Sequence, residues 1–370
     1  MGKINKPKIF SDEFYYKFGI KFPIIQAPMA GGGSSPKLVS AVGNNGALGF
    51  LAAGYLSADD LEKQILETKK LTKKPFGINL FIIEREKLLK LKKPLNIINI
   101  EKELGIYKNS LYQEVILDEE IEKKIDIIIK HNIQFVSFTF GLPDKKYLNL
   151  LHHNSIYLIG TATNIIEAKI IENAELDAIV VQGVEAGGHR GSFLNHDMND
   201  EIGLLSLLEE CSELLKLPII ASGGIVSGKS MLAAKILGAK AFQIGTAFLL
   251  TEESGISLKY KEALLNCHAH ETVLTDKVSG KKARGKKNIL INELEIKKGA
   301  KFKFPVQNFF TKELRAYANK NNLDEYLSLW CGQSVWKIKQ VKSVAKLIED
   351  LTIEFNEALT SCTKNLDLLK

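Results

Sequence analysis

Three ionisable side chains, Glu185, His189 and Arg190, stand together in a stretch, 182–191, in which four of ten residues are glycine. The stretch follows the apolar segment 178–181, whose β-branched residues and short length are typical of a parallel strand buried on both faces. Glycine lets a backbone approach a ligand closely, at an entropic cost that a simple connector need not bear. Barrel enzymes place reacting groups at the carboxyl ends of their strands, and imidazole titrates near neutral pH. His189 is therefore our candidate catalytic residue. The alternative is a glycine loop in which the imidazole caps a neighbouring carbonyl.

Two further glycine-bearing turns stand where a phosphate would bind. Ser222-Gly223-Gly224 follows the seventh expected strand, and Gln243, Gly245 and Thr246 end the eighth. In an α/β barrel this is the usual phosphate-binding place, where backbone N–H groups and the N-termini of the following helices hold the anion. The sequence has no GxxxxGK[ST] motif and no GxGxxG after a strand, which argues against a nucleoside triphosphate and a Rossmann dinucleotide. Tight helix–strand packing is the alternative reason for the glycines.

Amide and soft apolar side chains stand at other strand ends. Met29, preceded by Ala27-Pro28, joins Asn79, Gln182 and Gln243 in a set that suits a flat heteroaromatic ring with polar edges. Each has another explanation, since methionine fills cores and amides cap or form turns. With the two glycine turns, the set predicts a barrel-bound cofactor that carries a phosphate.

The elements that would position these residues form a repeat. From residue 22 onward, short apolar runs alternate with helical periodicity, which is typical of βα units around a parallel sheet. The expected strands are 23–27, 47–52, 75–80, 135–140, 156–160, 177–181, 218–221 and 241–244. The expected helices begin near 36 and cover 57–70, 118–131, 143–152, 164–173, 203–215 and 227–237, with a short one after the last strand. Eight such units predict an α/β protein with a TIM (β/α)8 barrel rather than an open doubly wound sheet.

Two segments depart from the repeat. Residues 81–117 are longer than a usual βα connection, and we interpret them as an insertion after strand three, a candidate lid over the barrel mouth. From residue 252 the repeat is lost, and 252–370 is expected to form a C-terminal extension of helices and loops that packs on the barrel, 1–251, and covers the active site.

Composition sets limits on partners. The chain has 370 residues, a formal net charge of +7 and only four arginines among 50 basic residues. Dispersed lysines do not suggest a nucleic-acid surface, and we interpret the basic run 281–287 as a solvated loop rather than a phosphate patch. Four widely spaced cysteines without a CxxC pair predict free thiols, a reducing compartment and no metal site. No apolar stretch of about 20 residues occurs, so we expect a soluble, cytoplasmic protein without membrane contact. Both a monomer and a homodimer stay open.

Motifs along nearly the whole chain resemble one family. The motifs are Pro23 to Gly32, Gly46 to Leu51, Pro75 to Phe81, Val136 to Gly141, Gln182 to Gly191, Ala221 to Ile225, Gln243 to Phe248, Thr272 to Thr275, Ser279 to Gly285 and Trp330 to Gln333. In this order they are similar to the bacterial type of the nitronate monooxygenases, formerly called 2-nitropropane dioxygenases.

The resemblance implies an FMN-bound barrel that oxidises alkyl nitronates, of the propionate 3-nitronate type, with O2 to a carbonyl product and nitrite, through one-electron transfer. It implies that His189 is the active-site histidine. The residues that it implies for FMN are Ala27, Pro28, Met29, Asn79, Gln182, Gly187, Gly188, Ser222, Gly223, Gly224, Gln243, Gly245 and Thr246. An imidazole that faces a nitronate would donate a hydrogen bond, and one that faces a neutral nitroalkane would remove its α-proton.

The chain departs from the family at Thr139, where a histidine is frequent, and at Cys331, where a smaller residue is frequent. The first departure bears on the substrate and leaves the cofactor site untouched. The FMN-dependent enoyl-acyl-carrier-protein reductases share the 185–189 core of the loop and are the alternative; they use NAD(P)H. A flavin-binding protein without turnover is a third possibility, because a fold does not fix a function.

Overall fold

The computed structural model describes residues 8–83, 86–108, 112–117, 119–194 and 201–366. In these ranges eight parallel strands form one sheet, in the order β1-β11-β10-β8-β7-β6-β3-β2. The strands are β1 (Ile24–Gln26), β2 (Phe50–Ala52), β3 (Gly77–Phe81), β6 (Phe135–Thr139), β7 (Tyr157–Ala162), β8 (Ala178–Gln182), β10 (Ile219–Ser222) and β11 (Ala241–Ile244). The ends of this order meet, because Gln26 N–H donates to Leu48 O (2.9 Å) and Leu48 N–H donates to Ile24 O (3.0 Å). The predicted TIM-like barrel is confirmed.

Helices follow the strands as the sequence predicts. They are α2 (Pro36–Asn44), α3 (Ala58–Leu71), α5 (Ile121–Lys130), α6 (Lys145–His153), α7 (Ile165–Asn173), α8 (Leu204–Leu214), α9 (Gly228–Ile236) and α10 (Thr246–Leu249). Side-chain caps fix several starts: Ser35 accepts from Leu38 N–H (3.1 Å) and Ser57 from Asp60 N–H (3.1 Å). Such caps satisfy N–H groups that have no partner in the first helical turn.

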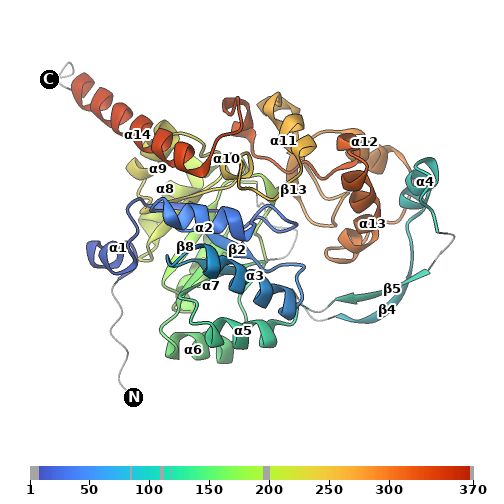
Figure 1. Cartoon of the computed structure of the whole chain (residues 1–370), viewed down its shortest axis with the longest axis horizontal. Helices are drawn as coiled ribbons and strands as arrows, with labels where there is room; N and C mark the ends of the chain where they lie inside the picture. The colour runs from blue at the N-terminus through green and yellow to red at the C-terminus, as the bar shows by residue number, and fades with distance from the viewer. Residues whose placement is uncertain (1–7, 84–85, 109–111, 118, 195–200, 367–370) are drawn as a thin grey trace.

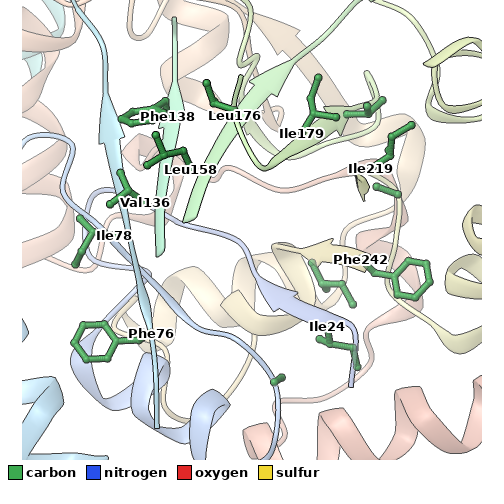
Figure 2. Close-up of a cluster of buried hydrophobic side chains, with 14 of the residues drawn as sticks. Ile24, Phe76, Ile78, Val136, Phe138, Leu158, Leu176, Ile179, Ile219 and Phe242 are labelled. Atoms are coloured by element: carbon green, nitrogen blue, oxygen red, sulfur yellow. The ribbon is translucent and has the colours of Figure 1, made fainter. Parts of the chain in front are cut away.

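Alternation along the strands separates two apolar layers. Ile24, Val136 and Ile179 point outward and pack under the helices (Figure 2). Their neighbours Ile25 and Val180 point inward and belong to a second cluster, since successive strand residues face opposite sides.

A helix that the sequence analysis did not anticipate joins the inner layer. It is α1 (Asp12–Phe18), whose Phe14 and Phe18 are buried against Phe135 and Tyr157, with ring centroids 5.0–5.8 Å apart. This layer lies at the amino ends of the strands, so α1 covers the amino-terminal end, or bottom, of the barrel.

The inner layer turns polar two residues further along each strand. Past the buried Ile25, Phe135, Ile159, Val180, Ile220 and Ala241 come the inward positions Ala27, Ser137, Thr161, Gln182, Ser222 and Gln243. The two-residue period of a strand places this second set above the first. The carboxyl end of the barrel therefore carries a ring of mostly polar side chains.

The insertion after β3 has secondary structure of its own. β4 (Glu86–Lys92) and β5 (Tyr112–Leu117) form an antiparallel ribbon that extends from the barrel in Figure 1, with α4 (Leu95–Glu103) between them. Ile97 and Ile100 of α4 are buried with Leu290 and Phe310 of the C-terminal segment. The insertion therefore packs on that segment through an apolar contact.

The C-terminal segment differs from the expectation of helices and loops alone. Its elements are α11 (Leu258–Leu265), η1 (Ala269–Glu271), β12 (Thr272–Thr275), β13 (Ala283–Lys286), α12 (Ile289–Ile296), α13 (Val306–Lys320), η2 (Asp324–Tyr326), η3 (Gln333–Lys337) and α14 (Val344–Leu366). β12, β13 and β9 (Gly188–His189) of the glycine-rich stretch form a three-stranded antiparallel sheet.

The interpretation of 281–287 as a solvated loop is wrong. Four of its residues form β13, and Arg284 is only 7% exposed, with its Nε donating to Val184 O (2.8 Å). Lys281 Nζ donates to Ser192 O (2.7 Å), and Lys286 Nζ donates to Ala263 O (3.0 Å). These charged groups donate to backbone carbonyls of the protein, because β13 pairs with β9 and so joins the barrel to the C-terminal segment.

Candidate active site

A cavity of about 760 Å³ opens at the carboxyl ends of the barrel strands. Its volume lies within the usual range of about 300–1,000 Å³ for cofactor and ligand sites. The predicted site residues that line it are Ala27, Pro28, Met29, Asn79, Gln182, Gly187, Gly188, His189, Ser222, Gly223, Gly224, Gln243, Gly245 and Thr246. The structure therefore brings the whole predicted set to one cavity. In the described ranges no group of three or more His, Cys, Asp or Glu side chains could hold a metal ion.

His189 is held by both parts of the chain. It belongs to β9, which pairs with β13 in the register His189 to Ala283. Its Nε2 lies 2.8 Å from the Oγ of Ser279, and the same hydroxyl lies 3.1 Å from Lys281 O. When Ser279 donates to that carbonyl, Nε2–H donates to Ser279 and Nδ1 carries the lone pair; when Ser279 donates to Nε2, Nδ1 carries the proton. Ser279 therefore selects the tautomer.

Aromatic rings surround the imidazole. The ring centroids of Phe140, Phe304 and Trp330 lie 6.0, 5.4 and 5.7 Å from that of His189. Burial, followed by the positive charges of Lys281 and Arg315, lowers the pKa of the imidazole from 6.5 to about 3. Low polarity and nearby cations both disfavour the charged form. His189 is therefore neutral at neutral pH, and the two charged groups that lower its pKa are positive.

The other two charged side chains of the loop have structural tasks. Arg190 is fully buried, and its guanidinium donates to Gly183 O (2.7 Å) and to Gln182 O (2.9 Å). Glu185 accepts from Leu204 N–H (3.0 Å) and so caps α8. Neither lines the cavity. Of the three side chains that the sequence placed together, only His189 faces the site.

Two amide side chains connect the cavity wall to its supports. Gln182 donates to His189 O (3.1 Å) and accepts from Arg190 Nη1 (3.0 Å), so it fixes the backbone of the histidine. Asn79 donates to Ser137 Oγ (2.9 Å) and Thr139 Oγ1 (3.0 Å). Thr139, the position at which the family frequently has histidine, thus lies in the cavity wall as an acceptor for Asn79.

The turn after β10 has the backbone of an anion cradle. Gly223 and Gly224 have φ of +107° and +69°, a conformation that L side chains rarely adopt. No protein group in the described ranges accepts from the backbone N–H of Gly224, Gly245 or Thr246. Free N–H groups on a glycine turn suit a phosphate, so the residues present fit a phosphate-bearing cofactor.

Helix N-termini contribute less to this cradle than expected. The start of α9 is closed by the Ser227–Ser230 capping box and by Glu354 of α14, whose Oε2 accepts from Gly228 N–H (3.0 Å). The other helix, α10, has only four residues. The turns themselves, rather than the helix dipoles, are therefore left to bind the anion.

Several residues of the site were not predicted from the sequence. Tyr55 and Phe140 line the cavity with φ of +69° and +73°, which is rare for bulky residues and gathers at functional sites. Ser137 and Thr161 could have been found by stepping two residues along each strand from the inner apolar layer. Ser279 and Arg315 gave no local signal, because they reach the site from the C-terminal segment.

Comparison with known proteins identifies the family of this chain. The model of the family described as nitronate monooxygenase matches residues 13–354. The chain belongs to the nitronate monooxygenase family. The "Probable nitronate monooxygenase" of Bacillus subtilis is 40% identical over 346 residues, covering 93% of this chain and 99% of that protein. Members of this family are flavin-dependent oxidoreductases that generally use FMN.

Solved structures of two similar proteins superpose on nearly the whole chain. A nitroalkane oxidase from Streptomyces ansochromogenes superposes with a TM-score of 0.83 at 34% identity, covering 93% of this chain and 98% of its own. FabK from Thermotoga maritima superposes with a TM-score of 0.74 at 27% identity, covering 95% and 98%. No helix in the described ranges of this family member combines the length and the apolarity needed to cross a membrane.

Proposed function

We propose that the protein binds FMN and oxidises alkyl nitronates with O2 to a carbonyl compound and nitrite, with propionate 3-nitronate as the substrate class. The observation that carries the proposal is the charge state of the site. A neutral His189 lies in the cavity that the two glycine turns border, and the positive charges of Lys281 and Arg315 are near enough to lower its pKa. Positive charge in a water-poor cavity favours an anionic substrate, and a nitronate is an anion.

FMN would span the two ends of this cavity. Its phosphate would lie on the N–H groups of Gly223, Gly224, Gly245 and Thr246, and its ring would lie toward Met29, Asn79, Gln182 and Gln243. Gly187 and Gly188 would border the ring beside His189. The bound flavin supplies the electron chemistry of the reaction. The protein would position the reactive carbon of the nitronate and exclude bulk water.

The role of His189 follows from its pKa. Removal of a proton from a neutral nitroalkane needs a base whose pKa lies near the working pH. An imidazole whose pKa is lowered to about 3 is a weak base. His189 would therefore act through hydrogen bonds rather than as a base, and its Nδ1–H would donate to an ionised nitronate in the tautomer in which Ser279 donates to Nε2. This favours nitronates over neutral nitroalkanes as substrates.

The proposal is tested with the purified protein and its visible spectrum. We expect a flavin spectrum, and we expect nitrite after aerobic mixing with propionate 3-nitronate. The corresponding carbon acid, 3-nitropropionate, whose nitro end is uncharged, should be much slower under conditions in which it stays protonated at carbon. A flavin spectrum without nitrite would refute the activity, and the absence of flavin would refute the cofactor.

An FMN-dependent enoyl-acyl-carrier-protein reductase is the second candidate, because it shares the 185–189 core of the loop. The two reactions differ in their reductant. Rapid bleaching of the flavin by NADH without oxygen would favour the reductase, whereas anaerobic bleaching by the nitronate favours the proposed reaction.

A further inference from the structure

A basic face of α13 lines the same cavity as the glycine turns. Asn308, Lys312, Arg315 and Asn319 all border the cavity. Their spacing of four, three and four residues places them on one face of the helix. α13 thus presents two cations to a cavity whose other wall carries His189 and the proposed flavin site.

The guanidinium of Arg315 is held by hydrogen bonds from Nε and Nη2. Its Nη2 donates to Asn308 O (2.9 Å) and Asn308 Oδ1 (2.8 Å), and its Nε donates to Thr311 Oγ1 (3.2 Å). Nη1 donates to no protein atom in the described ranges. No described carboxylate pairs with Arg315; the two carboxylates that line the same cavity, Glu119 and Glu120, are bound to Lys124 (2.9 Å) and Lys123 (2.7 Å). A held guanidinium with a free N–H edge is a ready site for an oxyanion.

Tyr55 does not neutralise this cation. Burial raises the pKa of the Tyr55 phenol well above its usual value, so the phenol keeps its proton at neutral pH. Its ring lies 5.4 Å from that of Phe81, on a backbone with a φ of +69°. Tyr55 thus lines the same cavity as Arg315 and offers a hydroxyl as a second donor.

The charge of Arg315 also reaches the histidine, since it contributes to the low pKa of His189. The two groups are therefore parts of one site rather than of two separate pockets. Lys281 lies with His189, because its Nζ is 5.0 Å from the ring centroid of Phe140. Lys312 and Arg315 thus line the cavity, and Lys281 adds a positive charge that acts on His189.

We propose that Arg315, with the hydroxyl of Tyr55, binds the carboxylate of a substrate that carries a nitronate at one end and a carboxylate at the other. This inference rests on the proposed function, and it assigns the distal anion to a named guanidinium. Lys312, one turn earlier on the same face, would add long-range attraction only, because its side chain is exposed.

The experiment compares two nitronates of equal chain length in the holoenzyme. Propionate 3-nitronate has the distal carboxylate, and propyl-1-nitronate has a methyl group in its place. In Arg315→Met we expect KM for propionate 3-nitronate to rise about 10- to 100-fold, the usual effect of losing a hydrogen bond to a charged group. KM for propyl-1-nitronate should change less than about twofold. Arg315→Lys keeps the charge without the fork and should fall between.

The matched control is Lys320→Met, which removes one positive charge from the exposed end of the same helix, away from the cavity. It should leave both KM values unchanged. Flavin content and melting temperature confirm that each variant is folded, and Arg315→Lys carries the test if Arg315→Met does not fold. Equal changes for the two nitronates, or no change for either, would overturn the proposal.

A binding measurement separates this proposal from the proposed activity. Succinate has two carboxylates at the spacing of the two anionic ends of propionate 3-nitronate, and butyrate has one. We expect calorimetry to show that the wild type prefers succinate to butyrate and that Arg315→Met loses the preference. A wild type that releases nitrite from neither nitronate but keeps this preference would refute the activity and retain the anion site. If NADH displaces succinate in the wild type, Arg315 binds a nucleotide phosphate instead, and the carboxylate assignment is overturned.

Discussion

His189 shows how strongly the surroundings of one residue decide its chemistry. The sequence identified it by its position after a buried strand, and left hydrogen-bond donation and proton removal both open. Burial and two cations lower its pKa to about 3, which makes donation the better supported role. Those cations come from residues 281 and 315, far along the chain, so no local pattern could have shown the shift.

The titration of His189 should be visible in stability. Its folded-state pKa of about 3 lies below the unfolded value of 6.5. Between these values the unfolded chain binds the extra proton, so the free energy of unfolding that depends on His189 falls as the pH falls through this window. Relative to His189→Asn, the free energy of unfolding of the wild type should fall by up to about 1.4 kcal/mol for each pH unit below pH 6. Urea unfolding at pH 7, 6 and 5 measures this, and parallel pH dependences of the two proteins would contradict it.

Ser279 is expected to act through His189. Ser279→Ala removes the buried hydroxyl that holds Nε2 at 2.8 Å, so the ring loses its fixed tautomer and orientation. We expect kcat for the nitronate to fall about 10-fold, the cost of one hydrogen bond in a buried site, with flavin content unchanged. Ser40→Ala, a buried serine of α2 whose hydroxyl donates to Lys37 O (3.0 Å), is the control. A loss of flavin in Ser279→Ala would show that Ser279 supports the fold instead.

The structural roles of Glu185 and Arg190 could not be predicted from the sequence. Both stand beside His189 in the sequence, yet one caps α8 and the other holds two carbonyls inside the protein. Which side chain of a loop faces a cavity depends on how the loop packs against other elements. Spacing alone does not contain that information.

Among the elements, those with a local signal were predicted and those without one were not. The barrel strands and their helices agree with the sequence because apolar runs, caps and turn glycines mark them. β12 and β13 have four residues each, and β13 reads Ala-Arg-Gly-Lys, so neither shows an apolar alternation. β12 pairs with the nearby β13, and β13 also pairs with β9, which is distant in the chain; that second pairing is a tertiary effect.

The turn after β10 supports a prediction about the cofactor. In Gly223→Val the new Cβ would lie 3.0 Å from Gly183 O on a backbone with a φ of +107°, and the side chain would occupy the proposed phosphate site. We expect the flavin content per protein to fall below about one tenth of the wild-type value, measured by absorbance after gel filtration. Gly105→Val imposes a similar backbone strain in open space at a φ of +70° and should keep its flavin. Equal flavin in both variants would refute the placement of the phosphate.

At the scale of the molecule, the two ends of the barrel have separate tasks. The bottom is a packed aromatic cluster around α1, and the top is a polar ring open to the cavity. Stability and chemistry can therefore be changed independently, as in other barrels of this class.

Phe14 tests this separation. It is fully buried against Phe18, Phe135 and Tyr157, so Phe14→Ala should cost about 3–5 kcal/mol of unfolding free energy. KM for the nitronate should not change, because the cavity lies at the opposite end. Tyr16→Ala, at a side chain that is 91% exposed, should cost less than about 0.5 kcal/mol. Denaturant unfolding and steady-state kinetics provide the two readouts. A raised KM in Phe14→Ala would show that the ends are coupled.

The pairing of β9 with β13 also sets an order of events during synthesis. His189 and Ser279 are separated by 90 residues in the chain, which a ribosome adds in about 5–20 s. The barrel strands are complete before Ser279 and β13 emerge, so a nascent chain can form its barrel while the histidine still lacks its partner strand. The reactive centre is finished only with the last third of the polypeptide. A chain truncated before Ser279 would therefore lack the groups that complete the surroundings of His189.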